Sequence, residues 1–363
     1  MKRKTKVGLL VAAGALAGVI IAVVIGVSWL MKQPLYRFGS VSSEKNLTAP
    51  LEPPEQVDGA VWQVEPGIGL HLDAFGEGRP VLVVHGGPGI PYASAWKGLR
   101  PLEDRFRFYY YHQRGCGEST RPFDRFESKN YYANMTTLER TLGLGAKIAD
   151  VERIRRILGQ EKLTIIGHSF GGFIASLYAA EFPQRVDRLI LVAPAGVLTP
   201  PDEERNIFQL ARERLPQEQH AAYDSVLAEY FDFPNIFSKS DSDLVTLHEA
   251  CGEYLVKAMG YDSLGMKDGP TSGGWTVFAL YFSMGRSYDF RSAVAEIEAP
   301  TLILHGADDE IALAGSRSYE RSIPDSRFVL VGREEQGAWA GHSVFDDCPV
   351  NFATAVAEFL EAE

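Results

Sequence analysis

A single serine stands in a glycine-rich turn between two apolar segments. Ser169 lies in the pattern Gly167-x-Ser169-x-Gly171, after a short apolar run (163–166) and before a second apolar segment (173–180). A sharp strand-to-helix turn exposes the serine hydroxyl, and the flanking glycines let strand and helix pass without a Cβ clash. Amides at the start of the helix favour developing negative charge. The pattern indicates a nucleophilic serine, although an incidental serine in a glycine-rich turn has the same five letters.

A nucleophilic serine needs a base and a group that orients the base. With the serine first in chain order, the acid and then the histidine should follow it, each just past a strand. His342 is the predicted base, because it follows the last apolar run of the chain. Asp309 is the favoured acid, at the spacing Gly306-x-x-Asp309 after the preceding run. Asp308 and Glu310 remain alternatives, because spacing alone does not separate them.

The other histidines fit the role of base less well. Three of them sit in motifs at strand ends and are expected to have structural roles: His85, His168 and His305. Three more lie in no recognisable motif: His71, His220 and His248.

An oxyanion hole needs backbone N–H groups beside the serine. The run 81–84 leads into His-Gly-Gly-Pro-Gly at residues 85–89, and Pro88 has no N–H to donate. The N–H of Gly87 is therefore the predicted donor from this loop. The N–H of Phe170, directly after the serine, is the predicted second donor.

Short apolar runs at regular intervals must position these residues. They are mostly continuous rather than alternating, which is typical of strands buried on both faces of a mainly parallel sheet. Helical patterns, such as 142–158 and 173–182, separate several of them, so the sequence predicts an α/β sheet flanked by helices. The runs are 81–84, 106–111, 163–166, 189–192, 301–304 and 328–331, preceded by a hairpin that starts at Ala60.

One interval breaks this rhythm. Residues 197–296 contain helical patterns and no convincing strand, and we interpret them as a helical cap inserted after the sixth strand. The α/β core would then comprise residues 60–196 and 297–363. A cap of this kind covers an active site and excludes water.

The N-terminal residues differ from the rest of the chain. A basic tail (1–6) precedes an uncharged run of 25 residues (7–31), and about 20 apolar residues suffice to span a bilayer. The charge distribution predicts a single-pass anchor with the tail in the cytoplasm and the catalytic domain outside it. A cleaved signal peptide, giving a secreted protein, is the alternative. The proline-rich segment 32–59 is expected to be a linker.

Composition limits the partners. The net charge is −11, and binding to the phosphate backbone of nucleic acid requires a basic face, so nucleic acid is not an expected partner. No phosphate-binding loop and no zinc-site spacing is present. Three cysteines, Cys116, Cys251 and Cys348, are too few for a disulfide framework, and the sequence does not say whether any pair forms.

Taken together, these motifs resemble the α/β-hydrolase fold and, within it, the proline iminopeptidase family. The resemblance rests on HGGPG at 85–89, HQRGCGES at 112–119, GHSFGG at 167–172 and the ending around Trp339 to Ser343. It covers about residues 60–196 and 297–363. It implies Ser169 as nucleophile, Asp309 as acid, His342 as base, and Gly87 with Phe170 at the oxyanion hole. It implies no metal and no cofactor.

The sequence departs from the family in two places. His112 stands where the family has an aspartate, which we expect to be structural. Family members bind the free amine of the substrate with carboxylates of the cap, because a buried ammonium needs an opposite charge. The carboxylates of this cap fit no motif of the family: Glu203, Glu204, Glu229, Glu249, Glu253 and Asp289.

The predicted function is that of a serine hydrolase acting on a small molecule or short peptide through an acyl-enzyme. Release of an N-terminal proline or small residue is favoured, with an esterase, lactonase or amide hydrolase on a small hydrophobic substrate as the alternative. Epoxide hydrolases and haloalkane dehalogenases are disfavoured, because they carry aspartate at the position of Ser169. A non-catalytic interaction scaffold is disfavoured as well, because such proteins usually lose a member of the triad.

Overall fold

Eight strands form one sheet in the computed structural model, which describes residues 33–55, 60–199, 206–261, 269–334 and 339–362. The order across the sheet is β1-β2-β4-β3-β5-β6-β7-β8. The strands are β1 (Val61–Glu65), β2 (Ile68–Phe75), β3 (Arg79–Val84), β4 (Phe106–Tyr111), β5 (Leu163–His168), β6 (Val186–Val192), β7 (Thr301–Gly306) and β8 (Ser326–Val331). Each of the apolar runs singled out in the sequence belongs to one of these strands.

The sheet is mainly parallel, as the sequence predicts. β1 and β2 form an antiparallel hairpin, and β2 pairs antiparallel with β4. From β4 through β3 to β8, all neighbouring strands are parallel. The carboxyl ends of the parallel strands therefore meet at one edge of the sheet, and the loops that follow them can share a site.

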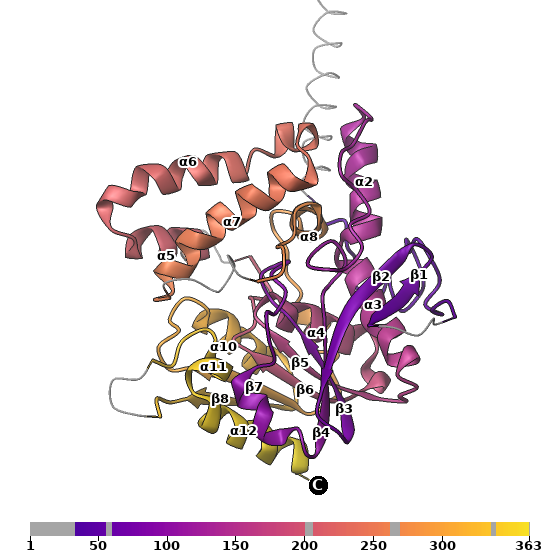
Figure 1. The fold of residues 1–363 in the computed structure, drawn as a ribbon, viewed down its shortest axis with the longest axis vertical. Coiled ribbons are helices and arrows are strands. Elements are labelled where there is room, and N and C mark those ends of the chain that lie inside the picture. Colours follow the sequence, from indigo (N-terminus) through magenta and orange to yellow (C-terminus); the bar gives the residue numbers. More distant parts are fainter. Residues whose placement is uncertain (1–32, 56–59, 200–205, 262–268, 335–338, 363) are drawn as a thin grey trace, which may run out of the picture.

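Helices cover both faces of the sheet (Figure 1). Successive residues of a strand point to opposite faces, so Leu82 and Val84 of β3 pack in one hydrophobic cluster, and Val81 and Val83 pack in another. This two-sided burial is why the strands are continuously apolar. The helices of the α/β core are α2 (Tyr131–Leu142), α3 (Leu144–Ile157), α4 (Phe170–Glu181), α10 (Leu313–Ser322), α11 (Val344–Asp347) and α12 (Pro349–Glu361). The short helix α9 (Arg291–Val294) lies within the interval predicted as cap but packs against α4 and α10 of the core.

One helical pattern of the sequence begins two residues before the helix that it predicts, and it does not include the helix that precedes it in the chain. The pattern 142–158 continues across Gly143, but α2 ends at Leu142 and α3 begins at Leu144. Gly143 is extended, with ψ −175°, and its N–H donates to the carbonyl of Glu139. The periodicity of apolar residues does not reveal this break, because both helices pack against α8.

The cap helices lie between β6 and β7 in the chain. α5, α6 and α7 form a layer above the α/β core in Figure 1, and α8 packs against α2 and α3. A separate hydrophobic cluster, which includes Tyr230, Leu244 and Trp275, forms the interior of this layer. The cap helices are α5 (Ile207–Arg214), α6 (His220–Tyr230), α7 (Asp241–Ala258) and α8 (Trp275–Met284).

The segment expected to be a linker is packed on the core where the structure describes it. Tyr36 is buried, and its hydroxyl donates to Glu181 at 2.7 Å. The N–H of Ser42 donates to the other oxygen of that carboxylate at 2.8 Å. Arg153 binds the carbonyls of Ala49 and Pro50. Residues 33–55 are therefore held by specific contacts along α3 and α4.

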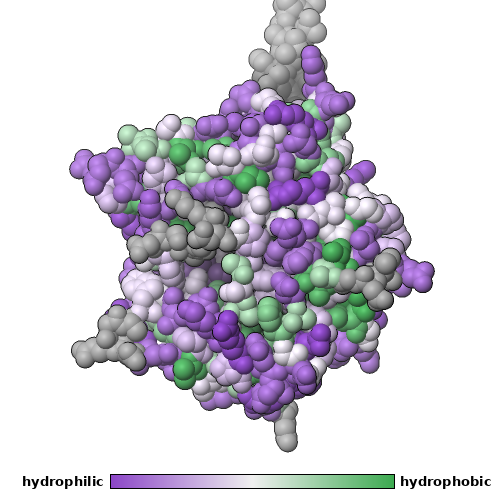
Figure 2. Space-filling view, in the orientation of Figure 1, coloured by the Kyte–Doolittle hydropathy of each residue, from purple (hydrophilic) through white to green (hydrophobic). Residues whose placement is uncertain are grey.

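In the part of the chain that the structure describes, no helix is both long and apolar enough to cross a membrane. The predicted anchor (7–31) and basic tail (1–6) lie outside the described residues. Figure 2 shows one face of the molecule, on which hydrophilic residues predominate and hydrophobic residues form small patches.

Candidate active site

The turn between β5 and α4 holds Ser169 in an unusual backbone conformation. Its φ is +52° and its ψ is −121°, a region that residues with a side chain rarely occupy. The flanking glycines make this turn possible, because a Cβ on Gly171 would lie 2.1 Å from the carbonyl oxygen of Val84. A Cβ on Gly167 would lie 2.6 Å from the carbonyl oxygen of Gly171. This close packing of strand and helix is what the sequence pattern predicts.

His342 and Asp309 form a hydrogen-bonded pair. Nδ1 of His342 lies 2.6 Å from Oδ2 of Asp309, and both residues are buried. The other carboxylate oxygen, Oδ1, accepts from the N–H of Ala312 at 3.2 Å. A carboxylate accepts only, so Nδ1 carries the proton and Nε2 is left free to take one.

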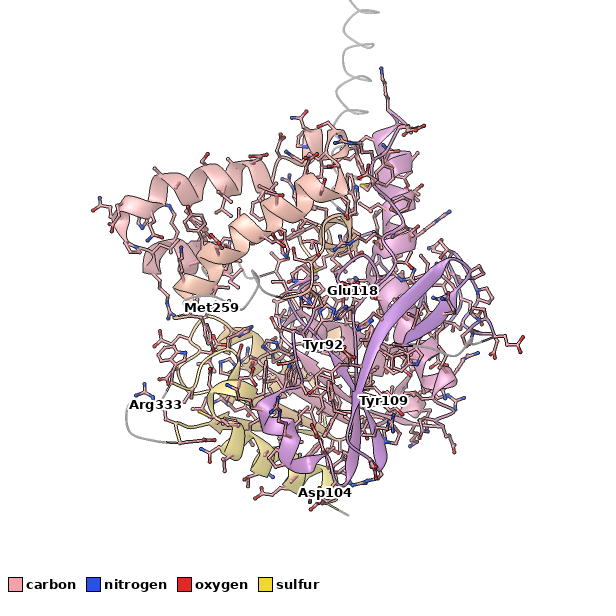
Figure 3. All side chains as sticks on the ribbon, viewed as in Figure 1. Tyr92, Asp104, Tyr109, Glu118, Met259 and Arg333 are labelled. Carbon is pink, nitrogen blue, oxygen red and sulfur yellow. The ribbon has the colours of Figure 1, made fainter. Side chains whose placement is uncertain are left out.

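The structure distinguishes the three carboxylates that the sequence spacing allows as the acid. Asp308 pairs with Arg333, which Figure 3 shows at the periphery of the molecule. Glu310 pairs with Arg214 of α5. Asp309 alone of the three contacts His342. Burial by itself would raise the pKa of Asp309, but the charge and hydrogen bond of His342 outweigh it and lower that pKa to about 2.

The glycine loop after β3 lies directly against Ser169. A Cβ on Gly86 would be 2.8 Å from Cβ of Ser169. Gly87 has a φ of +120°, which glycine adopts without strain. Within the described residues, no backbone carbonyl accepts from the N–H of Gly87 or of Phe170. Phe170 directly follows the serine and Gly87 directly follows Gly86, and neither predicted oxyanion donor is occupied by a backbone acceptor in the described residues.

Three histidines near the site hold the backbone through ring nitrogens, although His85 and His168 also line the cavity that Ser169 opens into. Nε2 of His168 lies 3.1 Å from the carbonyl of His342, and Nε2 of His305 lies 2.6 Å from the carbonyl of Asp309. Nε2 of His85 accepts from the N–H of Gln113 at 3.0 Å, so its Nδ1 donates to the carbonyl of Gly86. These contacts match the structural roles that the sequence suggests.

His112 also has a structural place. Its Nδ1 accepts from the N–H of Glu118 at 3.0 Å, and its carbonyl accepts from the hydroxyl of Ser119 at 2.6 Å. A histidine can therefore close this loop where the family has an aspartate. Cys116, Cys251 and Cys348 are buried free thiols.

Ser169 and His342 open into one cavity of about 930 Å³ between the core and the cap. Figure 3 labels two residues of its lining: Tyr92, in the loop after β3, and Met259, at the end of α7. Most of the lining is apolar, with aromatic side chains from the cap such as Tyr230 and Phe231. A cavity of this size fits a drug-sized ligand.

The carboxylates of the cap do not face this cavity where the structure describes them. Glu229 pairs with Lys239, Asp289 pairs with Arg291, and Glu249 accepts from Ser272. Glu253 does not line the cavity either, and Glu203 and Glu204 lie outside the described residues. The described carboxylates that line it are Glu310 and Asp346, both outside the cap.

One residue of the site has no signal in the sequence. His248 of α7 lines the cavity, and its Nε2 lies 2.9 Å from the carbonyl oxygen of Pro88 in the glycine loop. Its partner is 160 residues away in the chain, and no local motif surrounds it. Only the three-dimensional structure brings the two together.

Comparison with known proteins agrees with this architecture. Residues 79–347 match the family described as the alpha/beta hydrolase fold. The proline iminopeptidase of Heyndrickxia coagulans is 27% identical over 301 residues, which cover 80% of this chain and 93% of that protein. The 2-hydroxy-6-oxo-2,4-heptadienoate hydrolase of Pseudomonas putida is 28% identical over 306 residues, covering 82% and 94%.

A solved structure shares the fold. The esterase EaEST from Exiguobacterium antarcticum superposes with a TM-score of 0.54 at 20% sequence identity, covering 84% of this chain and all of that one. The family match spans most of the chain and includes strands β3 to β8, the Ser169 turn and the Asp309–His342 pair. The chain belongs to the α/β-hydrolase fold family, as a hydrolase that resembles the proline iminopeptidases.

Proposed function

We propose that the chain is a serine hydrolase that works through an acyl-enzyme. The observation that carries this proposal is the Asp309–His342 pair at 2.6 Å, which opens into the same cavity as Ser169 at its strained turn. A serine, a histidine and a carboxylate make up the catalytic unit of many hydrolases, with the carboxylate bound to the histidine as Asp309 is to His342.

In the proposed reaction, Oγ of Ser169 attacks the substrate carbonyl while Nε2 of His342 takes the hydroxyl proton. Asp309 keeps Nδ1–H in place and stabilises the imidazolium. The N–H groups of Gly87 and Phe170 donate to the oxyanion of the tetrahedral intermediate. His342 then gives its proton to the leaving group. Water, deprotonated by His342, attacks the acyl group, the bond between the acyl carbon and Oγ breaks, and His342 returns the proton to Oγ of Ser169 as the acid leaves.

The first candidate substrate is a peptide or amide with an N-terminal proline or small residue. It is favoured by the 27% identity to a proline iminopeptidase over most of both chains, together with the HGGPG loop. Such a substrate carries a free ammonium group, which needs a carboxylate partner once it is buried. Asp346 and Glu310 line the described cavity, and Glu203 and Glu204 are further candidates from the sequence.

The second candidate is a small hydrophobic ester, lactone or amide. It is favoured by the largely apolar lining of the cavity and by the absence of cap carboxylates from the lining that the structure describes. Turnover of a prolyl arylamide, its N-acylated form and p-nitrophenyl acetate by the full-length chain separates the two. A free-amine preference supports the first candidate, and ester turnover without prolyl activity supports the second.

The serine chemistry itself is tested with a fluorophosphonate probe. Ser169→Ala should abolish labelling and reduce turnover to background, because no nucleophile remains. Ser176→Ala, a buried serine on the same helix whose hydroxyl binds the carbonyl of Phe173, is the matched control and should still label. Labelling of Ser169→Ala at full strength would exclude Ser169 as the nucleophile.

We also propose that the segment 7–31 holds the hydrolase at a membrane with the catalytic domain outside the cytoplasm. The support is the length of the uncharged run and the basic residues before it. The full-length chain should resist carbonate extraction, and a chain lacking 7–31 should not. A mature N-terminus downstream of residue 31, found by mass spectrometry, would instead indicate a cleaved signal.

A further inference from the structure

The loop that carries one oxyanion donor is held from two sides. One side of the loop, residues 86–89, touches Ser169, as described above. On the other side, the carbonyl of Gly89 accepts from the N–H of Gly273, just before α8, at 2.7 Å. The carbonyl of Pro88 accepts from His248 of α7. Two segments of the cap therefore bind consecutive carbonyls of the loop.

The loop needs such external contacts because of its composition. Gly87 and Gly89 both have positive φ values, +120° and +69°. Glycine has many accessible conformations, so a loop rich in glycine does not by itself fix the direction of its N–H groups. Within the loop, the N–H of Ile90 donates to the carbonyl of Gly86 at 3.2 Å. The hydrogen bonds to the carbonyls of Pro88 and Gly89 both come from the cap.

The hydrogen bonds of His248 define its tautomer. A carbonyl oxygen only accepts, so the Nε2 of His248 carries the proton that is donated to Pro88. Nδ1 then accepts from the hydroxyl of Tyr230, on α6, at 2.9 Å. The hydroxyl of Tyr230 accepts in turn from Tyr281, on α8, at 3.5 Å. The hydroxyls of Tyr281 and Tyr230 and the imidazole of His248 thus form one chain of hydrogen bonds, in which each group donates to the next, and the last donates to the glycine loop.

The environment of His248 keeps this arrangement intact at neutral pH. Its side chain is almost wholly buried, between the cap interior and the cavity. Burial lowers the pKa of His248 to about 4, although the hydrogen bond to Pro88 acts in the opposite direction. The imidazole is therefore neutral at pH 7 and can both donate and accept.

We propose that His248 is a positioning residue that holds the oxyanion-hole loop from the cap and keeps the N–H of Gly87 in place beside Ser169. This proposal rests on the proposed serine hydrolase chemistry. His248 acts through the loop and not on the substrate carbonyl. Removing its donor should impair the step in which negative charge develops more than it impairs substrate binding.

The test is steady-state hydrolysis of p-nitrophenyl acetate by the full-length chain in detergent. In His248→Met the hydrogen-bond donor is lost while the side-chain volume stays similar. We expect kcat to fall about 10- to 100-fold, which is no more than the fall caused by removing an oxyanion donor itself. KM should change by less than about threefold, because the interaction matters mainly in the transition state. His248→Gln places an amide N–H near the position of Nε2 and should restore kcat to within about threefold.

Two further variants separate positioning from general damage. His248→Asn carries the same amide on a shorter side chain that does not reach Pro88, and it should resemble His248→Met. This variant decides the question if His248→Met does not fold. His220→Met removes another cap histidine, whose Nε2 binds the carbonyl of Leu215 and which does not line the cavity. It should keep the kcat of the unmodified protein.

The outcomes are distinct. Equal kcat for the Gln and Asn variants, or a change in KM with kcat unaltered, would overturn the positioning role. The positioning role would also be overturned if His248→Met hydrolyses the ester and reacts with fluorophosphonate at the rates of the unmodified protein while Ser169→Ala is inactive. Unchanged turnover in Ser169→Ala would overturn the serine hydrolase proposal and this inference together.

Discussion

At the scale of single residues, the contact with His342 determines the charge of Asp309. Burial of a carboxylate disfavours its ionised form, yet the hydrogen bond at 2.6 Å and the N–H of Ala312 compensate for the lost water. With a pKa of about 2, Asp309 is ionised at every pH at which the protein is expected to work. Any loss of activity between pH 4 and 7 therefore comes from another group.

This contact predicts the effect of removing the charge. Asp309→Asn keeps the shape of the side chain but favours the wrong imidazole tautomer, so kcat should fall by roughly 10⁴-fold, as it does when a triad aspartate becomes asparagine. Asp308→Asn is the matched control. It loses its pairing with Arg333 and should change kcat only slightly. Equal losses in both variants, measured on one ester substrate, would contradict the assignment of Asp309.

The sequence predicts residues that belong to local patterns and misses residues that act across the chain. Ser169, His342 and the glycine loop each stand in a short motif after a strand, where the parallel sheet brings them together. Asp309 follows from spacing as the favoured acid, and only its contact with His342 separates it from Asp308. His248 has no pattern, because its contact depends on how α7 is placed above the sheet.

At the scale of elements, the close approach of α4 to the sheet places Ser169. The start of this helix lies so near β3 that Gly171 has no space for a Cβ. The strands were predictable because two-sided burial demands continuous apolar runs. The docking of residues 33–55 was not, because their proline and polar residues give no periodicity, and their anchor, Glu181, lies more than 130 residues away.

The packing of α4 predicts that alanine at position 171 lowers the stability of the protein, although helix propensity alone would predict an increase. Gly171 lies inside α4, where exchange of glycine for alanine would stabilise an isolated helix by about 1 kcal/mol. Here the new Cβ meets the backbone of Val84, so Gly171→Ala should destabilise the protein by about 1–3 kcal/mol or more and abolish labelling of Ser169. Gly332→Ala, where a Cβ meets nothing within 4 Å, is the control for thermal unfolding. A higher melting temperature for Gly171→Ala would disprove the argument.

The anchoring of the N-terminal segment is tested at its carboxylate. Glu181→Ala removes the acceptor for Tyr36 and Ser42, and hydrogen bonds to a charged group contribute about 1.5–3 kcal/mol each. The segment should detach locally, so trypsin should cut after Lys45 much faster than in the unmodified protein. Glu358→Ala, on the exposed face of α12, is the control. Unchanged cleavage after Lys45 would mean that other contacts hold the segment.

At the scale of the whole molecule, a few buried polar groups join the cap to the core. Nζ of Lys147, on α3, donates to the hydroxyl of Thr276, on α8, at 2.8 Å. That hydroxyl donates to the carbonyl of Arg114 in the loop after β4. His248 and Gly273 bind the glycine loop close by. The cap helices α7 and α8 are thereby tied to the loop after β3, which lies against Ser169, and to the loop after β4.

The buried ammonium of Lys147 makes the stability of this junction depend on pH. Its side chain is 1% exposed, and burial lowers its pKa from 10.5 to about 8. Below pH 8 the folded protein holds a charge that water would solvate better. Between pH 8 and 10.5 the unfolded chain binds more protons at this site than the folded one, so the free energy of unfolding rises with pH. The full effect is about 3 kcal/mol.

Lys147→Met should remove this dependence. The variant fills a similar volume without a charge, so it should gain stability at pH 7 relative to the unmodified protein, and the gain should shrink as the pH approaches 9.5. Urea unfolding of both proteins at pH 7, 8 and 9.5 measures both trends, and the difference between the two proteins cancels the titration of the tyrosines that they share. Lys162→Met, at an exposed site, should show neither. A Lys147→Met gain that is constant with pH would mean that lost side-chain packing or the bond to Thr276, and not the buried charge, determines the contribution of Lys147.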